Sequence, residues 1–191
     1  RGLTDKTQIT LETLAGIKIL DLNVKDGEVQ TVRVNMGSPE LVPKNIPIDS
    51  NLDRFISEDV EVDGKVYKVT GVSMGNPHAV TFIDDTDSLE IEKIGPKFET
   101  HKLFPKKINT EFAQIVDRNT IKMRVWERGA GETLACGTGA CATMVAANLN
   151  GLVDDEADLV LLGGTLHIKW DKNENKVYMT GPAKFVFDGT I

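Results

Sequence analysis

The chain of 191 residues is long enough for one large or two small domains, and its 40% hydrophobic and 27% charged residues are ordinary for a soluble globular protein. Its formal net charge of −7 argues against a nucleic-acid or anionic-membrane surface, which would need clustered Lys and Arg. No apolar run reaches transmembrane length, so we expect neither a nucleic acid nor a membrane as partner.

In chain order, most of the sequence predicts short strands, because apolar and β-branched residues alternate with polar ones between turn residues. The expected strands are Gln8–Thr13, Ile17–Val24, Val29–Asn35, a hairpin over Val60–Val72, Ala79–Ile83, Thr110–Asp117, Thr120–Glu127, Leu159–Leu162, Thr165–Trp170, Lys176–Thr180 and a closing strand at Ala183–Phe187.

Two segments between these strands carry different patterns. Leu41–Ser50 contains two prolines and is expected to be an extended crossing segment. Asp85–Phe98 has apolar residues at helical spacing and is expected to form a short surface helix closed by Pro96.

The chain is organised around residues 125–147, which begin as a strand, pass through a glycine-rich loop and end as an Ala-rich helix. The helix is expected to start at Cys136 and run to about Asn150, ahead of Gly151. An apolar helix among many strands predicts an α+β protein, with a β-barrel or curved sheet wrapped around a central helix.

Cys136 is the strongest candidate for chemistry. Unpaired backbone N–H groups and the positive end of the helix dipole meet at a helix start, so the position favours both a bound carboxylate and a thiolate. Gly137 and Gly139 flank Thr138 and let a ligand approach the backbone. A small buried hydrophobe is the alternative interpretation of Cys136, and it is the one we favour for Cys141, which lies further along the helix.

Other candidates are weaker on pattern alone. Glu127 and Arg128 are either an exposed ion pair or a proton-exchanging carboxylate beside a carboxylate-binding guanidinium. Gly75–His78 places an amide, a rigid turn and an imidazole ahead of a strand, which suits a site at a strand end. Asn109 signals a ligand contact only weakly. His101 and His167 lie in no comparable motif, and we interpret both as incidental. The spacing of Cys and His predicts no metal site.

A weak internal repeat relates residues 14–39 to residues 162–182, each copy reading strand, turn, strand, Gly, Pro. Cys136 lies about 28 residues before Gly164, so a matching loop and helix would lie about 28 residues before Gly16, ahead of Arg1. The repeat therefore predicts a second half that is incomplete here, unless the two hairpins are alike by chance.

Gly75–His78, Asn109–Phe112 and Glu127–Gly139 together closely resemble the diaminopimelate epimerase family, and the resemblance runs through essentially the whole chain in the same order. It implies a cofactor-independent isomerase that interconverts LL- and meso-diaminopimelate, a precursor of lysine and peptidoglycan, in a homodimer. The two cysteines, five residues apart on one expected helix, are not expected to form a disulfide, so a reducing cytoplasm is the expected setting. The resemblance also implies two pseudo-symmetric halves, here a remnant of the N-terminal half (1–37), the C-terminal half (38–180) and a terminal strand returning to the N-terminal half (181–191).

The resemblance implies roles for individual residues as well. Cys136 is similar to one of two cysteines that exchange protons on opposite faces of the α-carbon. The matching site residues are Glu127 as partner of Cys136, His78 as partner of the other cysteine, Gly137 and Thr138 as amide donors to the substrate carboxylate, and Asn76, Asn109, Glu127 and Arg128 as substrate-binding positions.

The sequence departs from the family pattern at one point, since the Asn-Gly motif that carries the other cysteine is absent. We therefore expect this chain alone to be inactive. Two rival interpretations stay open: another isomerase of the same fold, related to proline racemase or to the phenazine-biosynthesis isomerases, or a non-catalytic carboxylate-binding module.

Overall fold

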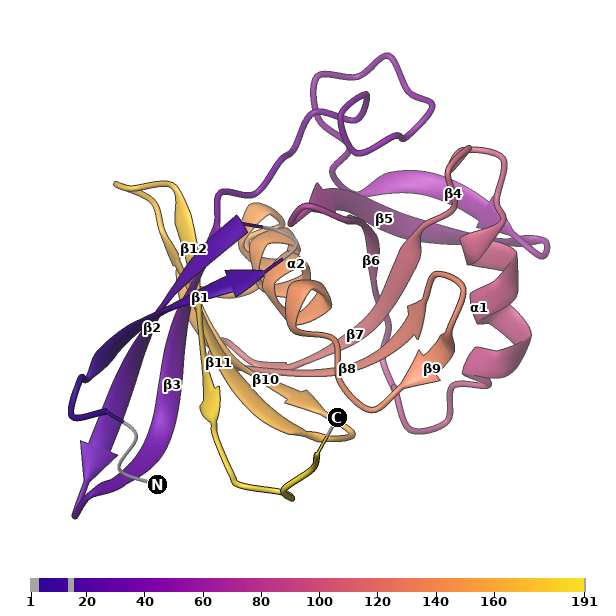
Figure 1. Cartoon of the computed structure of the whole chain (residues 1–191). Coiled ribbons are helices and arrows are strands. Elements are labelled where there is room, and N and C mark those ends of the chain that lie inside the picture. The colour runs from indigo at the N-terminus through magenta and orange to yellow at the C-terminus, as the bar shows by residue number, and fades with distance from the viewer. Residues whose placement is uncertain (1–3, 14–15, 191) are drawn as a thin grey trace.

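The computed structural model describes residues 4–13 and 16–190, which form one mixed sheet and two helices (Figure 1). The strands are β1 (Gln8–Thr13), β2 (Gly16–Lys25), β3 (Glu28–Gly37), β4 (Glu58–Val62), β5 (Lys65–Ser73), β6 (Pro77–Phe82), β7 (Asn109–Asp117), β8 (Thr120–Glu127), β9 (Gly131–Thr133), β10 (Glu156–Leu161), β11 (Gly164–Asp171) and β12 (Lys176–Pro182), and the helices are α1 (Ile91–Glu99) and α2 (Gly137–Leu149). Neither helix is long and apolar enough, in the described part of the chain, to cross a membrane.

The sheet has the order β1-β2-β3-β12-β11-β10-β8-β7-β6-β5-β4, with β9 paired to β8. Two neighbouring pairs, β6 with β7 and β8 with β10, are parallel, and the other pairs are antiparallel. Figure 1 shows the sheet curving around α2, while β1 and β4 stay at its two edges. The expected curved sheet around a central helix is therefore confirmed, but the described strands do not close into a barrel.

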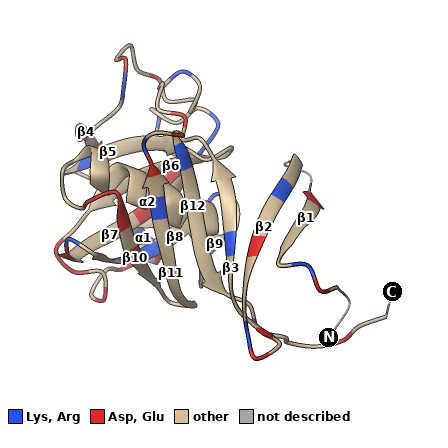
Figure 2. Cartoon of the chain, turned by 90° about the vertical axis from the view of Figure 1, so that its left-hand side faces the viewer, with Lys and Arg blue, Asp and Glu red and all other residues tan. Residues whose placement is uncertain are grey.

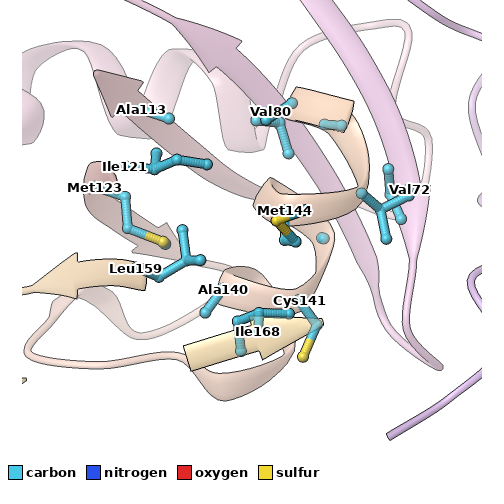
Figure 3. Close-up of a cluster of buried hydrophobic side chains, with 14 of the residues drawn as sticks. Val72, Val80, Ala113, Ile121, Met123, Ala140, Cys141, Met144, Leu159 and Ile168 are labelled. Atoms are coloured by element: carbon cyan, nitrogen blue, oxygen red, sulfur yellow. The ribbon is translucent and has the colours of Figure 1, made fainter. Parts of the chain in front are cut away.

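Helix α2 lies inside the curve because it has no face suited to water. Its 13 residues include no charged side chain, so it has no red or blue segment in Figure 2, and every residue from Gly139 to Ala147 is buried. Met144 packs among side chains from the surrounding strands, such as Val72, Val80 and Ile168 (Figure 3). Burial at about 25 cal/mol per Å² of apolar surface makes enclosure by the sheet the stable arrangement.

The side chains enclosed between the sheet and α2 form one core, the α2 core. A second core, the α1 core, lies on the opposite side of β5 to β8, where α1 packs. Residues alternate between the two cores along each strand, as the two-residue period of a strand requires. On β7, for example, Phe112 enters the α1 core, while Ala113 enters the α2 core. The same alternation fixes which side chains at the strand ends face the start of α2.

Trp126 connects α1 to the end of β8. Its indole Nε1 donates a hydrogen bond of 2.9 Å to Glu99 Oε2 on α1. Its ring lies so close to Gly95 that an added Cβ there would be 2.7 Å from Trp126 Cε3. Glu99 also accepts a hydrogen bond from the amide of Gly129. Helix α1 therefore fixes the strand end that carries Glu127 and the loop that follows.

The expected strands agree with the observed ones within a few residues except at the end of the chain, and β9 is an addition that the pattern did not predict. The two hairpins of the weak repeat, β2–β3 and β11–β12, are both formed and lie side by side through the β3–β12 pair. Leu14 and Ala15, which open the first copy, lie outside the described residues. The division at residues 37 and 180 stays a prediction.

Three expectations were wrong. Residues 43–47 form turns rather than an extended crossing segment, and Ile46 within these turns and Ile48 directly after them are buried in the core. Helix α1 begins at Ile91, not near Asp85, and Pro96 lies inside it. Residues 183–190 form no strand, because β12 already has β11 and β3 on its two sides.

Gly95→Ala tests the contact between α1 and Trp126. In an exposed helix this change stabilises by roughly 0.5–1 kcal/mol. Here the added methyl group would overlap the indole, so we expect the free energy of unfolding to fall by about 1–3 kcal/mol in urea denaturation. Lys93→Ala, on the exposed side of the same helix, is the control and should change it by less than about 0.5 kcal/mol. A more stable Gly95→Ala chain would contradict the packing.

Candidate active site

A group of polar side chains lies where three central strands end beside the start of α2. His78, Glu111 and Glu127 each lie two residues from a member of the α2 core, namely Val80, Ala113 and Val125. The two-residue period of a strand therefore turns all three toward α2. Apolar residues enclose the helix along its length, and this polar group meets its N-terminal end.

Cys136 is the N-cap residue of α2, as the sequence predicts. Its backbone is extended (φ −131°, ψ 106°), and its carbonyl accepts the first helical hydrogen bond from Ala140. Its Sγ accepts a hydrogen bond of 3.4 Å from the amide of Gly139 and lies 3.5 Å from Thr138 Oγ1. The residue is 6% exposed, so the thiol is nearly enclosed by its own helix turn and the sheet.

The electrostatics at Cys136 oppose ionisation. Burial and the nearby Glu111 carboxylate, with a smaller contribution from Glu127, raise the pKa of the thiol to about 11. The hydrogen bonds from Thr138 and Gly139 lower it, but by less. At neutral pH the group is a thiol, whereas the position at a helix start had favoured a thiolate. Burial and the Glu111 charge therefore outweigh the two hydrogen bonds to the thiol.

The first turn of α2 has backbone N–H groups that no described residue pairs. No hydrogen bond forms at the amides of Gly137 and Thr138 within the part of the chain that the structure describes. Both amides lie at the positive end of a 13-residue helix, beside Cys136 Sγ. Such an end is suited to hold a carboxylate. The structure thus brings a proton-carrying thiol and a carboxylate site together on one helix turn.

His78 is fully buried and lies between two polar partners. Its Nδ1 is 2.7 Å from Glu111 Oε1, and its Nε2 is 3.0 Å from Asn76 Oδ1. Both Glu111 and His78 are 0% exposed. A buried carboxylate is costly unless it is paired, so the imidazole is the partner that makes Glu111 tolerable in the core.

Asn109 and Arg128 join the strand ends to the loop. Asn109 Nδ2 donates to the carbonyl of Pro77 at 2.8 Å, and its Oδ1 accepts from the amide of Arg128 at 2.9 Å. The Nδ2 and Oδ1 atoms of this buried side chain therefore connect the start of β6 to the loop after β8. The Arg128 guanidinium donates to the carbonyl of Lys106 at 3.0 Å and is exposed, so part of it stays accessible to a ligand.

Glu127 is close enough to influence Cys136 by its charge, but its carboxylate accepts its short hydrogen bond from Thr133 Oγ1 on β9. Among the described residues, Cys136 and Glu127 share no direct hydrogen bond. Cys141 is a free thiol like Cys136, lies 0% exposed in the α2 core, and has its pKa raised by burial. It fits the structural role that the sequence predicts.

The sequence interpretation missed Glu111. A charged residue directly before the apolar Phe112 and Ala113 of a predicted strand is the signal that could have identified it, because the two-residue period of a strand places it on the same face as Ala113. Of the remaining histidines, His101 packs against Phe104 and His167 pairs with Asp158 on the surface, both away from this group.

Comparisons with known proteins agree on one family. A family model described as diaminopimelate epimerase matches residues 70–186. The diaminopimelate epimerase of Acetivibrio thermocellus is 59% identical over 191 residues, which cover 100% of this chain and 68% of that protein. A diaminopimelate epimerase of Methanococcus maripaludis is 52% identical, with 100% of this chain and 69% of that protein covered.

Solved structures agree on the fold. A probable proline racemase from Agrobacterium radiobacter superimposes with a TM-score of 0.66 at 15% identity, covering 98% of this chain and 63% of that one. A hydroxyproline epimerase from Agrobacterium vitis gives 0.66 at 12% identity, covering 94% and 58%. At such low identity these two structures show the shared fold and nothing more.

The raised pKa of Cys136 predicts its reactivity. Alkylation by iodoacetamide requires the thiolate, so the rate at Cys136 should keep rising by about tenfold per pH unit up to about pH 11. In the urea-unfolded chain it should level off near the ordinary value of 9.0. Peptide mapping separates Cys136 from Cys141. A native plateau below pH 8 would show an activated thiolate and contradict the burial argument.

Proposed function

This chain belongs to the diaminopimelate epimerase family, and from that membership we propose that it is an isomerase that interconverts LL- and meso-2,6-diaminopimelate at the start of α2. The observation that supports this function most is the first turn of α2. There Cys136 Sγ and the unpaired amides of Gly137 and Thr138 lie side by side. An α-amino acid placed there would have its carboxylate on the amides and its α-carbon near the thiol.

The reaction needs two proton carriers and a stabilised carbanion. One base removes the α-proton, and the Cys136 thiol gives its own proton to the opposite face of the planar carbanion, so that the configuration inverts. In the reverse direction the Cys136 thiolate removes the proton. Because an α-hydrogen is a very weak acid, the amides at the helix start must stabilise the charge that develops on the carboxylate. No cofactor is needed in this scheme.

The other residues at the strand ends have roles around this exchange. Glu127 acts on the Cys136 thiol by its charge, and His78 is the proton partner of the second cysteine. The exposed guanidinium of Arg128 is suited to a carboxylate. Asn76 and Asn109 are substrate-binding positions, and Asn109 also holds the loop in place by accepting the hydrogen bond of the Arg128 amide. These assignments follow the family resemblance and agree with the contacts described above.

The proposed setting also follows from the family. Diaminopimelate is a precursor of lysine and of the peptidoglycan cross-link, so the proposed reaction belongs to those biosyntheses. We further propose a homodimer in the cytoplasm, with the small amino acid as its ligand.

Two other functions are less well supported. A proline racemase-like or phenazine-biosynthesis-like isomerase would share the fold, but Arg128 at the edge of the site favours a substrate with a second charged end. A carboxylate-binding module without catalysis would use the same amides, yet it would not need a thiol beside them. Turnover on diaminopimelate, proline and glutamate, and exchange of the α-hydrogen with solvent deuterium, separate the three.

A hybrid enzyme tests the function of this chain. The matched part of the Acetivibrio thermocellus enzyme is replaced by these 191 residues, which align with it over their whole length. We expect the hybrid to epimerise LL-diaminopimelate and to incorporate deuterium from D₂O at the α-carbon. Cys136→Ala should lower the rate by roughly 100-fold or more, since it removes one proton carrier. Cys141→Ala is the matched control and should keep most of the activity. A hybrid that turns over proline but not diaminopimelate would contradict the proposed substrate.

The isolated 191-residue chain tests the need for two cysteines. Its second cysteine, Cys141, is enclosed in the α2 core on the same helix and cannot reach the opposite face of a substrate. We therefore expect the chain alone to epimerise LL-diaminopimelate no faster than its Cys136→Ala variant. A rate clearly above that variant would mean that another group supplies the second proton.

A further inference from the structure

Glu111 is a buried carboxylate that contacts the proposed catalytic groups on two sides. It lies in the middle of the sheet on β7, is 0% exposed, and turns toward α2. Its Oε1 is bonded to His78, and its Oε2 has no hydrogen-bond partner among the described residues. A charged group buried with an unpaired oxygen is costly for stability, so packing alone does not account for it.

On one side Glu111 fixes the state of an imidazole. An ionised carboxylate accepts hydrogen bonds and donates none, so the 2.7 Å contact places a proton on His78 Nδ1. The Nε2 atom then faces the side-chain amide of Asn76, at 3.0 Å from its Oδ1, and is the ring nitrogen that the carboxylate does not hold. This arrangement follows the general rule that a carboxylate behind an imidazole sets its tautomer and its orientation.

On the other side Glu111 lies beside the thiol, across the space that Gly139 leaves open. A Cβ on Gly139 would be 2.6 Å from Glu111 Oε1 and 3.2 Å from Cys136 Sγ. Both atoms therefore border the same small gap, and any larger residue at position 139 would separate or displace them. In a buried setting a negative charge so close to sulfur disfavours the thiolate.

We propose that Glu111 is a positioning residue shared by two groups of this site, the His78 imidazole and the Cys136 thiol: its carboxylate holds the proton on Nδ1 of His78 and keeps Cys136 in the thiol form. The two groups are thereby set in complementary states, with a proton ready at Sγ and an imidazole oriented for exchange. The role in catalysis depends on the proposed epimerase function. The effect on the thiol does not, and it is measured without substrate.

Other groups around Cys136 must be considered in the test. Titratable or charged side chains that face it are Glu111 on β7, Glu127 on β8 and Cys141 within α2, with His78 on β6 reaching it through Glu111. Glu127 raises the pKa of the thiol less than Glu111 does, and its carboxylate accepts a hydrogen bond from Thr133 on β9.

Glu111→Gln removes the charge while keeping the size of the side chain. We expect the pH midpoint of Cys136 alkylation to fall by about one unit, which makes the reaction about tenfold faster at pH 8. Alkylation of Cys141 should stay slow, which shows that the core has not opened. An unchanged midpoint at Cys136 in the folded variant would overturn the proposal.

Asp158→Asn is the matched control, because His167 Nδ1 and Asp158 Oδ1 form a second imidazole–carboxylate pair, at 2.8 Å on the surface. The same loss of charge there should leave the Cys136 midpoint where it is in the unaltered chain. An equal shift in this variant would mean that net charge, rather than the contact, controls the thiol, and it would contradict the role of Glu111.

A second measurement uses the unaltered chain, so it tests the role of Glu111 even if the Glu111→Gln variant does not fold. In ¹⁵N NMR, Nδ1 of His78 should carry a proton, as its contact with the Glu111 carboxylate requires. An Nδ1 without a proton would overturn the proposal. If the hybrid enzyme shows no turnover but both thiol and imidazole behave as stated, the proposed function fails and the role of Glu111 stands. If the hybrid enzyme epimerises diaminopimelate but the pH midpoint of Cys136 alkylation does not shift in Glu111→Gln, the proposed function stands and the role of Glu111 fails.

Discussion

The burial of α2 is the constraint on which the rest of the structure depends. A helix with no charged residue and nine consecutive buried positions has no stripe that can face water. The sheet must therefore bend around it, and β5 to β8 and β10 to β12 supply apolar side chains on the enclosing face. Once the helix is enclosed, its N-terminal end emerges at one edge of the core. Cys136 and the unpaired amides lie there as a consequence.

The same strand periodicity that builds the core also builds the site. Along β6, β7 and β8, every second residue faces α2, and these residues change from apolar in the middle to polar at the strand ends. His78, Glu111 and Glu127 are thus placed by the positions that hold Val80, Ala113 and Val125. A buried carboxylate among them costs several kcal/mol, which the imidazole offsets only in part. Such a cost is typical of a position kept for its chemistry.

The sequence predicted what depends on local patterns. Alternation identified most strands, and the change from glycine-rich loop to apolar helix located α2 and its N-cap cysteine. Helix α1 was misplaced because Phe98 and Ile91 pack into the second core and keep the helix intact around Pro96, a tertiary effect that a helix-breaking rule ignores. The contact between His78 and Glu111 joins residues that are 33 apart in the sequence, so no local pattern predicts it. The pKa of Cys136 likewise depends on burial and on Glu111, which lies 25 residues away in the sequence.

We propose that the first turn of α2 binds the substrate carboxylate beside the thiol. Amide ¹H–¹⁵N spectra of the hybrid enzyme, selectively labelled and titrated with meso-diaminopimelate, test it most directly. We predict that the amide signals of Gly137 and Thr138 move downfield and saturate with the ligand, since a carboxylate accepts their hydrogen bonds, while amides at the far end of α2, such as Asn148, stay in place. Signals of Gly137 and Thr138 that do not move at saturating ligand would contradict the account.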